Sequence, residues 1–325
     1  MKAFLAILGC VGFLISCEKS PSASGAAGGT SNPIVLQLNW KAEPEFGGFY
    51  AAKINGAFDE QRLTVDVREG GPGTPTIDMV AAGTVPFAVV SGDELIVARA
   101  RGKKVVALFA VYQTHPQAIM TRASRGFKEI GDVFSSEGTL AMEKGLPYSD
   151  FLRNKYGFDK LQIVPSPGGD LSKFRSDDKY SMQCFIISEP IAAKRIGVEA
   201  KTFLIADAGY NPYATVLVTN EDFLTKNGTT VEKVVRAVAE GWQAYLENPA
   251  TANAEMAKIN TAMDPQTFTE AADVQKQLIV TPDTEKNGLG SMTKDRWQAL
   301  GQQLVDLKVI DKAPPAEECY LWVLK

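Results

Sequence analysis

Strand-like and helix-like segments alternate along most of this chain, and the alternation restricts the folds open to it. Strands that alternate with helices favour parallel β-α-β units, so we expect the α/β class. The predicted strands are 34–40, 63–68, 87–90, 105–111, 117–121, 139–142, 161–165, 182–187 and 214–219. The predicted helices begin within 49–58 and continue with 76–82, 94–101, 149–156, 171–176 and a largely helical stretch over 221–307.

The alternation of strands and helices occurs twice along the chain, which predicts two α/β lobes. Lobe one is expected to contain residues 32–116 and 218–325, and lobe two residues 117–217. The chain would then cross between the lobes near 113–121 and near 211–220. Because open α/β sheets bind ligands at the carboxyl ends of their strands, and clefts between domains are favoured sites, we expect a ligand cleft between the lobes.

The N-terminus has the pattern of an export signal. A positive start at Met1-Lys2 precedes a mostly apolar, uncharged run over 3–15, too short to span a bilayer. The run ends at Leu-Ile-Ser-Cys, which resembles the bacterial lipobox and implies acylation of Cys17. Residues 18–31 would then be a flexible tether, and the chain would be exported and lipid-anchored to a bacterial cell membrane. The alternative is an ordinary cleaved signal with an incidental cysteine.

Composition excludes several function classes. The 325 residues are 45% hydrophobic and 22% charged, with a formal net charge of -4 and no basic block, so a nucleic-acid partner is not expected. One histidine and no cysteine pair at ligand spacing argue against a metal site. Beyond Cys10 and Cys17, Cys184 and Cys319 either form a disulfide or are two buried thiols.

Several segments resemble the solute-binding proteins of ABC importers. The nearest family is the thiamine-pyrimidine-synthase-like (NMT1/THI5-like) family. The resemblance spans about residues 34–220 and rests on 38–52, 56–58, 82–89, 91–93, 188–190 and 207–213. It implies a two-lobed periplasmic-binding-protein type II fold that closes on a small heteroaromatic solute, such as a thiamine pyrimidine precursor.

The resemblance also implies the partners. The binding protein would act as a monomer without a cofactor and deliver its solute to an ABC permease. A flavin precursor, a sulfonate or a nitrate-type solute is the alternative ligand. A sensory receptor domain is a third interpretation of the same pattern.

The family includes an enzyme branch that makes the thiamine pyrimidine with iron and a histidine of its own. That branch needs a reactive histidine and a cysteine-rich segment. Here the only histidine is His115, followed by Pro116, and there is no cysteine cluster. We therefore expect a binding protein and not an enzyme, with His115 as a polar contact near the hinge.

Two residues are expected to contact the ring of the solute. Trp40 stands where the first strand ends, where an indole stacks on a flat heterocycle or else caps the core of the lobe. Glu189 follows an apolar strand, and the resemblance implies that a glutamate at such a position binds an aminopyrimidine edge. The alternative for Glu189 is a solvated loop carboxylate.

Three more residues are expected around the cleft. Ser91 ends a buried strand and is expected to face the cleft, although a serine or Asp93 there also caps the following helix. Tyr148 occupies the matching place in lobe two and is expected to close over the solute. Tyr210 lies just before the second crossover, where packing at the hinge explains it nearly as well.

The first matched segment supplies further candidates, namely Glu43, Phe46, Gly47 and Tyr50. Two glutamates in a turn, Glu43 and Glu45, suggest acid–base chemistry but are usually solvated. The glycine would let the backbone approach a ligand, and a helix start there would favour an anionic group, unless this is a plain turn.

The glycine-rich loop at 70–75 is the last candidate. Its backbone N–H groups, around Gly73, would cradle a phosphate or carboxylate, or form an ordinary turn.

Overall fold

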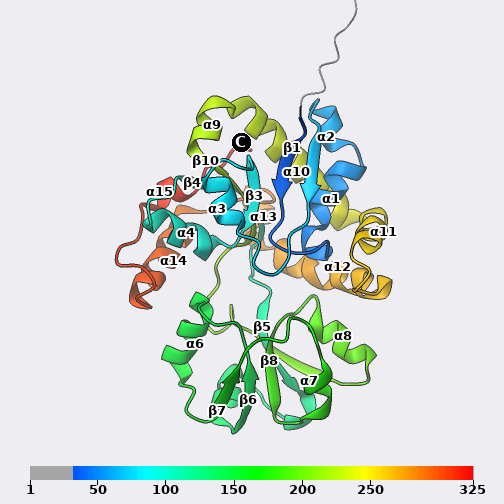
Figure 1. The fold of residues 1–325 in the computed structure, drawn as a ribbon, viewed down its shortest axis with the longest axis vertical. Helices are drawn as coiled ribbons and strands as arrows, with labels where there is room; N and C mark the ends of the chain where they lie inside the picture. The colour runs from blue at the N-terminus through cyan, green and yellow to red at the C-terminus, as the bar shows by residue number, and fades with distance from the viewer. Residues whose placement is uncertain (1–31, 325) are drawn as a thin grey trace, which may run out of the picture. The chain divides into compact units, whose positions relative to one another are not determined.

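Two five-stranded sheets organise residues 32–324, the part of the chain that the computed structural model describes (Figure 1). The first sheet has the order β2-β1-β3-β10-β4, with β1 Ile34–Gln37, β2 Val65–Arg68, β3 Phe87–Val90, β4 Val105–Tyr112 and β10 Ala214–Asn220. The second has the order β7-β6-β8-β5-β9, with β5 Gln117–Arg122, β6 Gly138–Ala141, β7 Leu161–Val164, β8 Tyr180–Phe185 and β9 Ala200–Leu204. The predicted signal at 1–17, with Cys17, and the tether at 18–31 lie outside the described residues.

The α/β class is confirmed, but the sheets are mixed and not parallel throughout as we expected. Strands β2, β1 and β3 run parallel, whereas β10 pairs antiparallel with both β3 and β4. In the second sheet β5 is antiparallel to β8 and β9. The reason is how the chain passes between the sheets. Strands β5 and β10 each enter their sheet directly from the other sheet, without the crossover helix that would make them parallel to their neighbours.

Helices cover both sheets. Those associated with the first sheet are α1 Gly47–Ile54, α2 Ala57–Glu60, α3 Thr76–Ala81, α4 Gly92–Ala100, α9 Glu221–Lys226, α10 Gly228–Glu247, α11 Ala250–Ile259, α12 Pro265–Ile279, α13 Pro282–Asn287, α14 Lys294–Asp306 and α15 Ala316–Cys319, with the 3-10 turn η1 Pro44–Phe46. Between β5 and β9 are α5 Ile130–Ser135, α6 Pro147–Tyr156, α7 Ser172–Ser176 and α8 Glu189–Arg195, with η2 Ala123–Arg125. We call the two groups the first and second lobe. Within residues 32–324, no helix has the length and apolar character needed to span a membrane.

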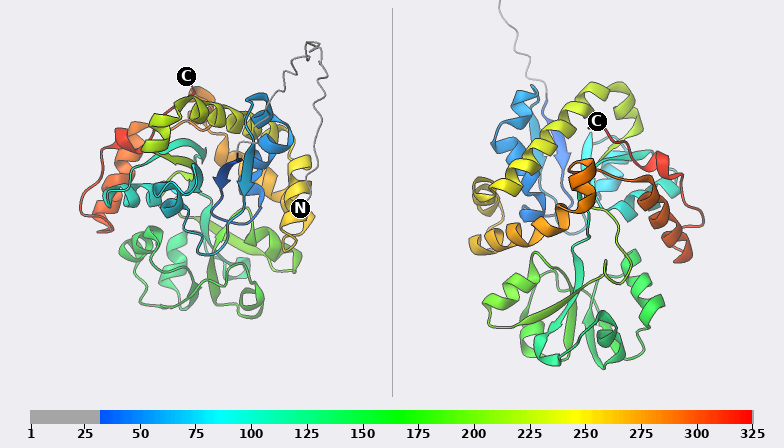
Figure 2. Two further views of the ribbon diagram at one scale, coloured as in Figure 1. Left: turned by 45° about the horizontal axis from the view of Figure 1, so that its top comes forward. Right: turned by 180° about the vertical axis from the view of Figure 1, so that it is seen from behind.

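The sequence patterns missed the shortest of these elements. Strand β9, helices α5, α8 and α15 and the 3-10 turns η1 and η2 were not predicted, because each is short and carries too few apolar residues to show a period. The long amphipathic stretch expected over 231–246 is α10, the yellow-green helix that runs diagonally across the first lobe in the right-hand view of Figure 2.

Helices α1 and α10 pack unusually closely, and this contact explains the Gly47-Gly48 pair. A Cβ atom on Gly47 would lie 2.1 Å from the Tyr245 ring, and one on Gly48 would lie 2.2 Å from the Trp242 ring. Both aromatic rings belong to α10 and are buried in the core. The glycines therefore admit the aromatic face of α10 against the α1 backbone.

A small hydrogen-bond network ties together the two connections between the lobes. The Arg296 guanidinium on α14 donates to the carbonyl oxygens of Gln113 (2.5 Å) and Asn211 (3.1 Å), one in each connection. The backbone N–H of His115 donates to Asn211 Oδ1 at 2.8 Å. Arg296 also stacks on Tyr213, with the guanidinium carbon 3.9 Å from the ring centroid. One cation thus holds both connecting strands.

Both cysteines of the described region are free and buried. Cys184 lies in β8 of the second lobe and Cys319 in α15 of the first. Burial raises the pKa of both thiols, so each stays protonated and packs as a small apolar side chain. Of the two alternatives that the sequence left open, the structure has the pair of buried thiols.

Candidate functional site

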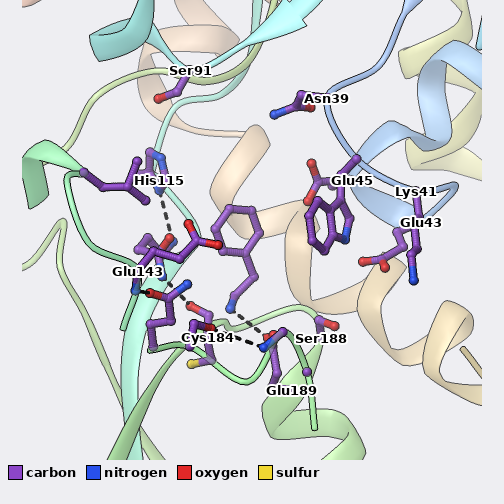
Figure 3. Close-up of a pocket in the computed structure, with 18 of the residues that line it drawn as sticks. Asn39, Lys41, Glu43, Glu45, Ser91, His115, Glu143, Cys184, Ser188 and Glu189 are labelled. Carbon is purple, nitrogen blue, oxygen red and sulfur yellow. Dashed lines mark hydrogen bonds between the residues drawn. The ribbon is translucent and has the colours of Figure 1, made fainter. Parts of the chain in front are cut away.

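A pocket of about 600 Å³ lies between the two lobes, in the size range of small-molecule sites. Its walls come from the loop after β1 and the start of α4 on one side, and from α6, β8 and the start of α8 on the other (Figure 3). Most of its ionisable lining groups are acidic, namely Glu43, Glu45, Asp93, Glu94, Glu143, Glu189 and Asp264, beside Lys41 and His115.

Six of the ten residues that the sequence singled out for ligand binding line this pocket. They are Trp40, Glu43, Ser91, Tyr148, Glu189 and Tyr210. They are far apart in the sequence and come together because strand ends of both lobes meet at the same place.

The other four residues lie outside the pocket lining. Phe46 and Tyr50 are buried in the hydrophobic core of the first lobe, and Gly47 packs against Tyr245 of α10. Gly73 is an exposed turn residue with a positive φ of 79°, in a loop whose Thr74 Oγ1 accepts a hydrogen bond from the N–H of Gly71. The short helix after that loop, α3, begins away from the pocket lining as well.

Ser91 both caps a helix and faces the pocket. Its backbone N–H donates to Glu94 Oε2 at 2.8 Å, which closes a capping box at the start of α4. Its hydroxyl donates to Asp93 Oδ1, and the other oxygen of that carboxylate accepts from Tyr210 OH at 2.7 Å. Asp93 therefore fixes Ser91 and Tyr210 relative to each other, and both roles considered for Ser91 apply together.

Tyr148 is positioned by a shared acceptor in the second lobe. Its hydroxyl donates to Gln183 Oε1, which also accepts from the backbone N–H of Glu143 at 2.5 Å. The tyrosine is buried at the start of α6, and burial raises the pKa of its phenol. It therefore offers the pocket a ring face and a neutral hydroxyl.

Glu189 is the first residue of α8, and its carboxylate returns toward β8. Its Oε2 atom accepts from the backbone N–H of Phe185 at 2.9 Å. Burial raises the pKa of Glu189, and the backbone hydrogen bonds oppose that rise. The side chain is thus not the solvated loop carboxylate that the sequence left open.

Glu45 is buried and Glu43 is half-buried, contrary to the expectation of a solvated turn. Burial, and next the charge of Glu189, raise the pKa of Glu43 to about 7, while Trp40, Lys41 and Asn260 lower it. Glu45 is only 6% exposed, and burial followed by the charge of Glu43 raises its pKa well above the usual range. The turn is held under α12, where Gln275 Nε2 donates to the Pro44 carbonyl at 3.0 Å.

His115 lines the pocket as a neutral imidazole. Its Nδ1 atom accepts from the backbone N–H of Gln117 at 3.1 Å, so the ring proton is on Nε2. Burial lowers the pKa of His115 to about 4, opposed by Asp93 and reinforced by Arg296. It is a hydrogen-bonded group at the start of the second lobe, in line with the contact near the hinge that we expected.

Several pocket residues were missed by sequence reasoning. Asn39 and Asp93 follow the strand-end rule that singled out Trp40 and Ser91, so that signal was available. Asn260 and Asp264 come from the ends of α11 and α12, and no local pattern connects them with the first strand. Among residues 32–324, no group of three or more His, Cys, Asp or Glu side chains is arranged to hold a metal ion.

Comparison with known proteins identifies the family. The model of the family described as "NMT1/THI5 like" matches residues 43–252, more than half of the chain. The chain belongs to the NMT1/THI5-like family. The match begins at the pocket residue Glu43 and ends before Asn260 and Asp264, so α12 adds pocket residues beyond the matched segment.

The relatives of this NMT1/THI5-like chain include proteins named for binding a ligand and proteins named as synthases. The formylaminopyrimidine-binding protein of Halalkalibacterium halodurans is 23% identical over 319 residues, covering 92% of each chain. The riboflavin-binding protein RibY of Chloroflexus aurantiacus is 24% identical over 71% of this chain and 68% of its own. The 4-amino-5-hydroxymethyl-2-methylpyrimidine phosphate synthase THI11 of Saccharomyces cerevisiae is 24% identical over 69% of this chain and 70% of its own.

Solved structures confirm the two-lobed fold of periplasmic binding proteins. The periplasmic aliphatic sulphonate binding protein SsuA of Escherichia coli has a TM-score of 0.67 at 14% identity, covering 88% of this chain and 91% of its own. A Candida albicans gene product described as having the generic periplasmic binding protein fold has a TM-score of 0.62 at 13% identity, covering 89% and 96%. At such identities the likeness concerns the fold alone.

Proposed function

We propose that this chain is the solute-binding component of an ABC importer and that it captures a small heteroaromatic solute, such as a thiamine pyrimidine precursor. The observation that carries the proposal is the pocket, which has the Trp40 indole on the first lobe and the Glu189 carboxylate on the second. An indole stacks on a flat ring, and a carboxylate accepts N–H bonds from its edge. Relatives named for binding formylaminopyrimidine and riboflavin support this choice.

Capture would work by a shift between open and closed arrangements of the lobes. A solute that contacts both walls stabilises the arrangement in which the walls are close, and the permease would recognise that arrangement. We propose lobes of residues 32–116 with 218–325, and of 117–217, with one adjustment. Because β10 begins at Ala214, residues 214–217 go with the first lobe.

The alternatives differ in how well the pocket suits them. A flavin precursor is a flat heterocycle and stays the second candidate. A sulfonate or nitrate-type anion would meet a wall of carboxylates, which disfavours it. A synthase of this family would need a cysteine-rich segment beside its reactive histidine, and the sequence has four cysteines with no cluster among them. We therefore favour a binding protein over an enzyme.

Export is part of the same proposal. We propose that residues 1–17 direct export, that Cys17 is acylated, and that the chain works as a monomer outside the cell membrane. Replacing Cys17→Ser in the full-length protein is expected to move it from the membrane fraction to the released fraction. Retention of the Cys17→Ser protein in the membrane fraction would contradict the lipid anchor.

The solute is tested by thermal melting against pyrimidines, thiamine derivatives, flavins and sulfonates. A ligand at about 100 times its Kd adds roughly 2.7 kcal/mol, a shift of several degrees for a protein of this size. We expect one heterocycle to give such a shift, and Trp40→Ala and Glu189→Ala each to remove it.

Trp322→Ala is the matched control, because Trp322 is partly buried but outside the pocket lining. It should lower the melting temperature of the free protein and leave the ligand-induced shift intact. A rise in melting temperature with sulfonates alone would contradict the proposal of a heteroaromatic solute.

A further inference from the structure

Acidic side chains from both lobes line the pocket. Glu43 and Glu45 come from the turn after β1, and Glu189 comes from the start of α8 (Figure 3). The charge of Glu189 contributes to the raised pKa of both turn glutamates, so the three carboxylates lie within electrostatic reach of one another. We call these three residues the glutamate cluster.

Two acceptors in the pocket lining, one inside the cluster and one outside it, have no protein donor. Glu45 is 6% exposed and lines the pocket, and no hydrogen bond or ion pair from residues 32–324 reaches its carboxylate. Asn39 Oδ1, also in the lining, is buried and accepts no hydrogen bond. Buried acceptors are nearly always paired, so Asn39 Oδ1 points to a ligand that supplies donors, and the Glu45 carboxylate is free to accept from the same ligand.

The protein supplies little positive charge to the cluster. Lys41 is exposed, and Arg195 is engaged by Asp264 and Glu270 of α12. Behind Glu45, the neutral Tyr112 and Gln275 are hydrogen-bonded to each other, and Asn260 on the near side is neutral as well. Few cations of the protein therefore offset the charge of the cluster, and the pKa of each of its three carboxyl groups is raised.

A second acidic group, of Asp93, Glu94 and Glu143, occurs elsewhere in the lining. Desolvation raises the pKa of the Glu94 carboxyl to about 7, although the residue is partly open to solvent, and the charges of Asp93 and of Glu143 in the second lobe add to this. His115, close by, is neutral and adds no positive charge. Acidic side chains thus line both walls of the pocket.

We propose that the solute carries a positive charge, and that this charge binds among Glu43, Glu45 and Glu189 and displaces the proton held there to solvent. The inference rests on the proposed import function and narrows its ligand class to cationic heterocycles. A cation between carboxylates of opposite lobes attracts both walls, so it favours closure.

The first test compares a cationic with a neutral probe that shares the same ring. Thiamine carries a permanent positive charge, and 4-amino-5-hydroxymethyl-2-methylpyrimidine does not. By isothermal titration calorimetry at pH 7.5, we expect thiamine to bind at least about tenfold more tightly. Glu45→Gln should reduce that ratio toward one, and the exposed control Glu60→Gln should leave it unchanged.

The second test counts protons. Near pH 6.5 a group with a pKa of about 7 is mostly protonated, so cation binding should release close to one proton per thiamine. The count comes from binding enthalpies in two buffers with different heats of ionisation. It should fall at pH 8.5 and in Glu43→Gln.

The outcomes separate the two proposals. A neutral pyrimidine that binds as tightly as thiamine, with no proton release, overturns the cationic ligand and keeps the import function. If neither probe nor a flavin binds, or if only anions bind, the heteroaromatic function fails and the inference fails with it.

Discussion

At the scale of single residues, the least expected feature is a half-buried carboxylate with a near-neutral pKa. Burial and the charge of Glu189 raise the pKa of Glu43 from 4.5 to about 7. In the unfolded chain the same group ionises at its ordinary value. Between these two values the folded state holds more protons than the unfolded state, so this group makes stability fall as pH rises.

Glu43→Gln removes that effect. The variant should match the wild type below about pH 4.5, where both states are protonated, and exceed it in unfolding free energy by about 3 kcal/mol above pH 7. Urea unfolding at a series of pH values measures the difference. Glu60→Gln, exposed on α2, is the control and should follow the wild type throughout. A wild type that is more stable than Glu43→Gln at pH 8 would contradict the half-buried, proton-holding carboxylate.

At the scale of elements, the contact between α1 and α10 anchors the pocket turn. Helix α1 follows directly after η1, which carries Glu45, so the position of α1 sets the position of that side chain. The contact depends on glycines on both helices, because a Cβ on Gly241 would lie 2.3 Å from the Gly48 carbonyl oxygen. Close packing of this kind leaves no room for one added methyl group.

Gly48→Ala tests this contact. Its new Cβ would collide with the Trp242 ring, so the variant should lose about 1–3 kcal/mol of stability despite the better helix propensity of alanine. Gly228→Ala is the control at the start of α10, since nothing lies within 4 Å of a Cβ there. It should be neutral or slightly stabilising in the same thermal denaturation experiment. Equal stability of the two variants would argue against the close approach.

At the scale of the whole molecule, ion pairs join the lobes away from the connecting strands. Arg195 on α8 of the second lobe pairs with Asp264 and with Glu270 of α12 in the first, the latter at 2.9 Å. The arginine is mostly buried, while its partners are nearer to solvent. The pairs hold α8 against α12 at the edge of the pocket, next to the glutamate cluster.

Arg195→Gln should shift the lobes toward the open arrangement. Losing ion pairs that are partly exposed to solvent costs about 1 kcal/mol, roughly a fivefold change in the population of the arrangement they stabilise. Small-angle X-ray scattering of the ligand-free protein should show a larger radius of gyration, with the difference reduced at high salt. Lys258→Gln, which removes an exposed pair within α11, is the control. An unchanged radius for Arg195→Gln would mean that the pairs do not hold the lobes.

How much of this was readable from the sequence depends on the range of the interactions. The periods of apolar residues predicted nine of the strands, because a strand that is buried in a sheet must be apolar. The strand-end rule also located Trp40 and Ser91, which depend on local order along the chain. Phe46 and Tyr50 were candidates only because they are near Trp40 in sequence, and the helical turn between them directs both into the core.

The sequence by itself determined the α/β class, the positions of most strands, and the family to which the chain belongs. Those follow from local patterns and from matched segments. The tertiary structure alone decided the antiparallel direction of β10, the fit of α10 against Gly47 and Gly48, and the burial that raises the pKa of Glu43 and Glu45. The physical reason is that desolvation and the electric field at a side chain come from residues distant in sequence, and only the folded chain brings them together.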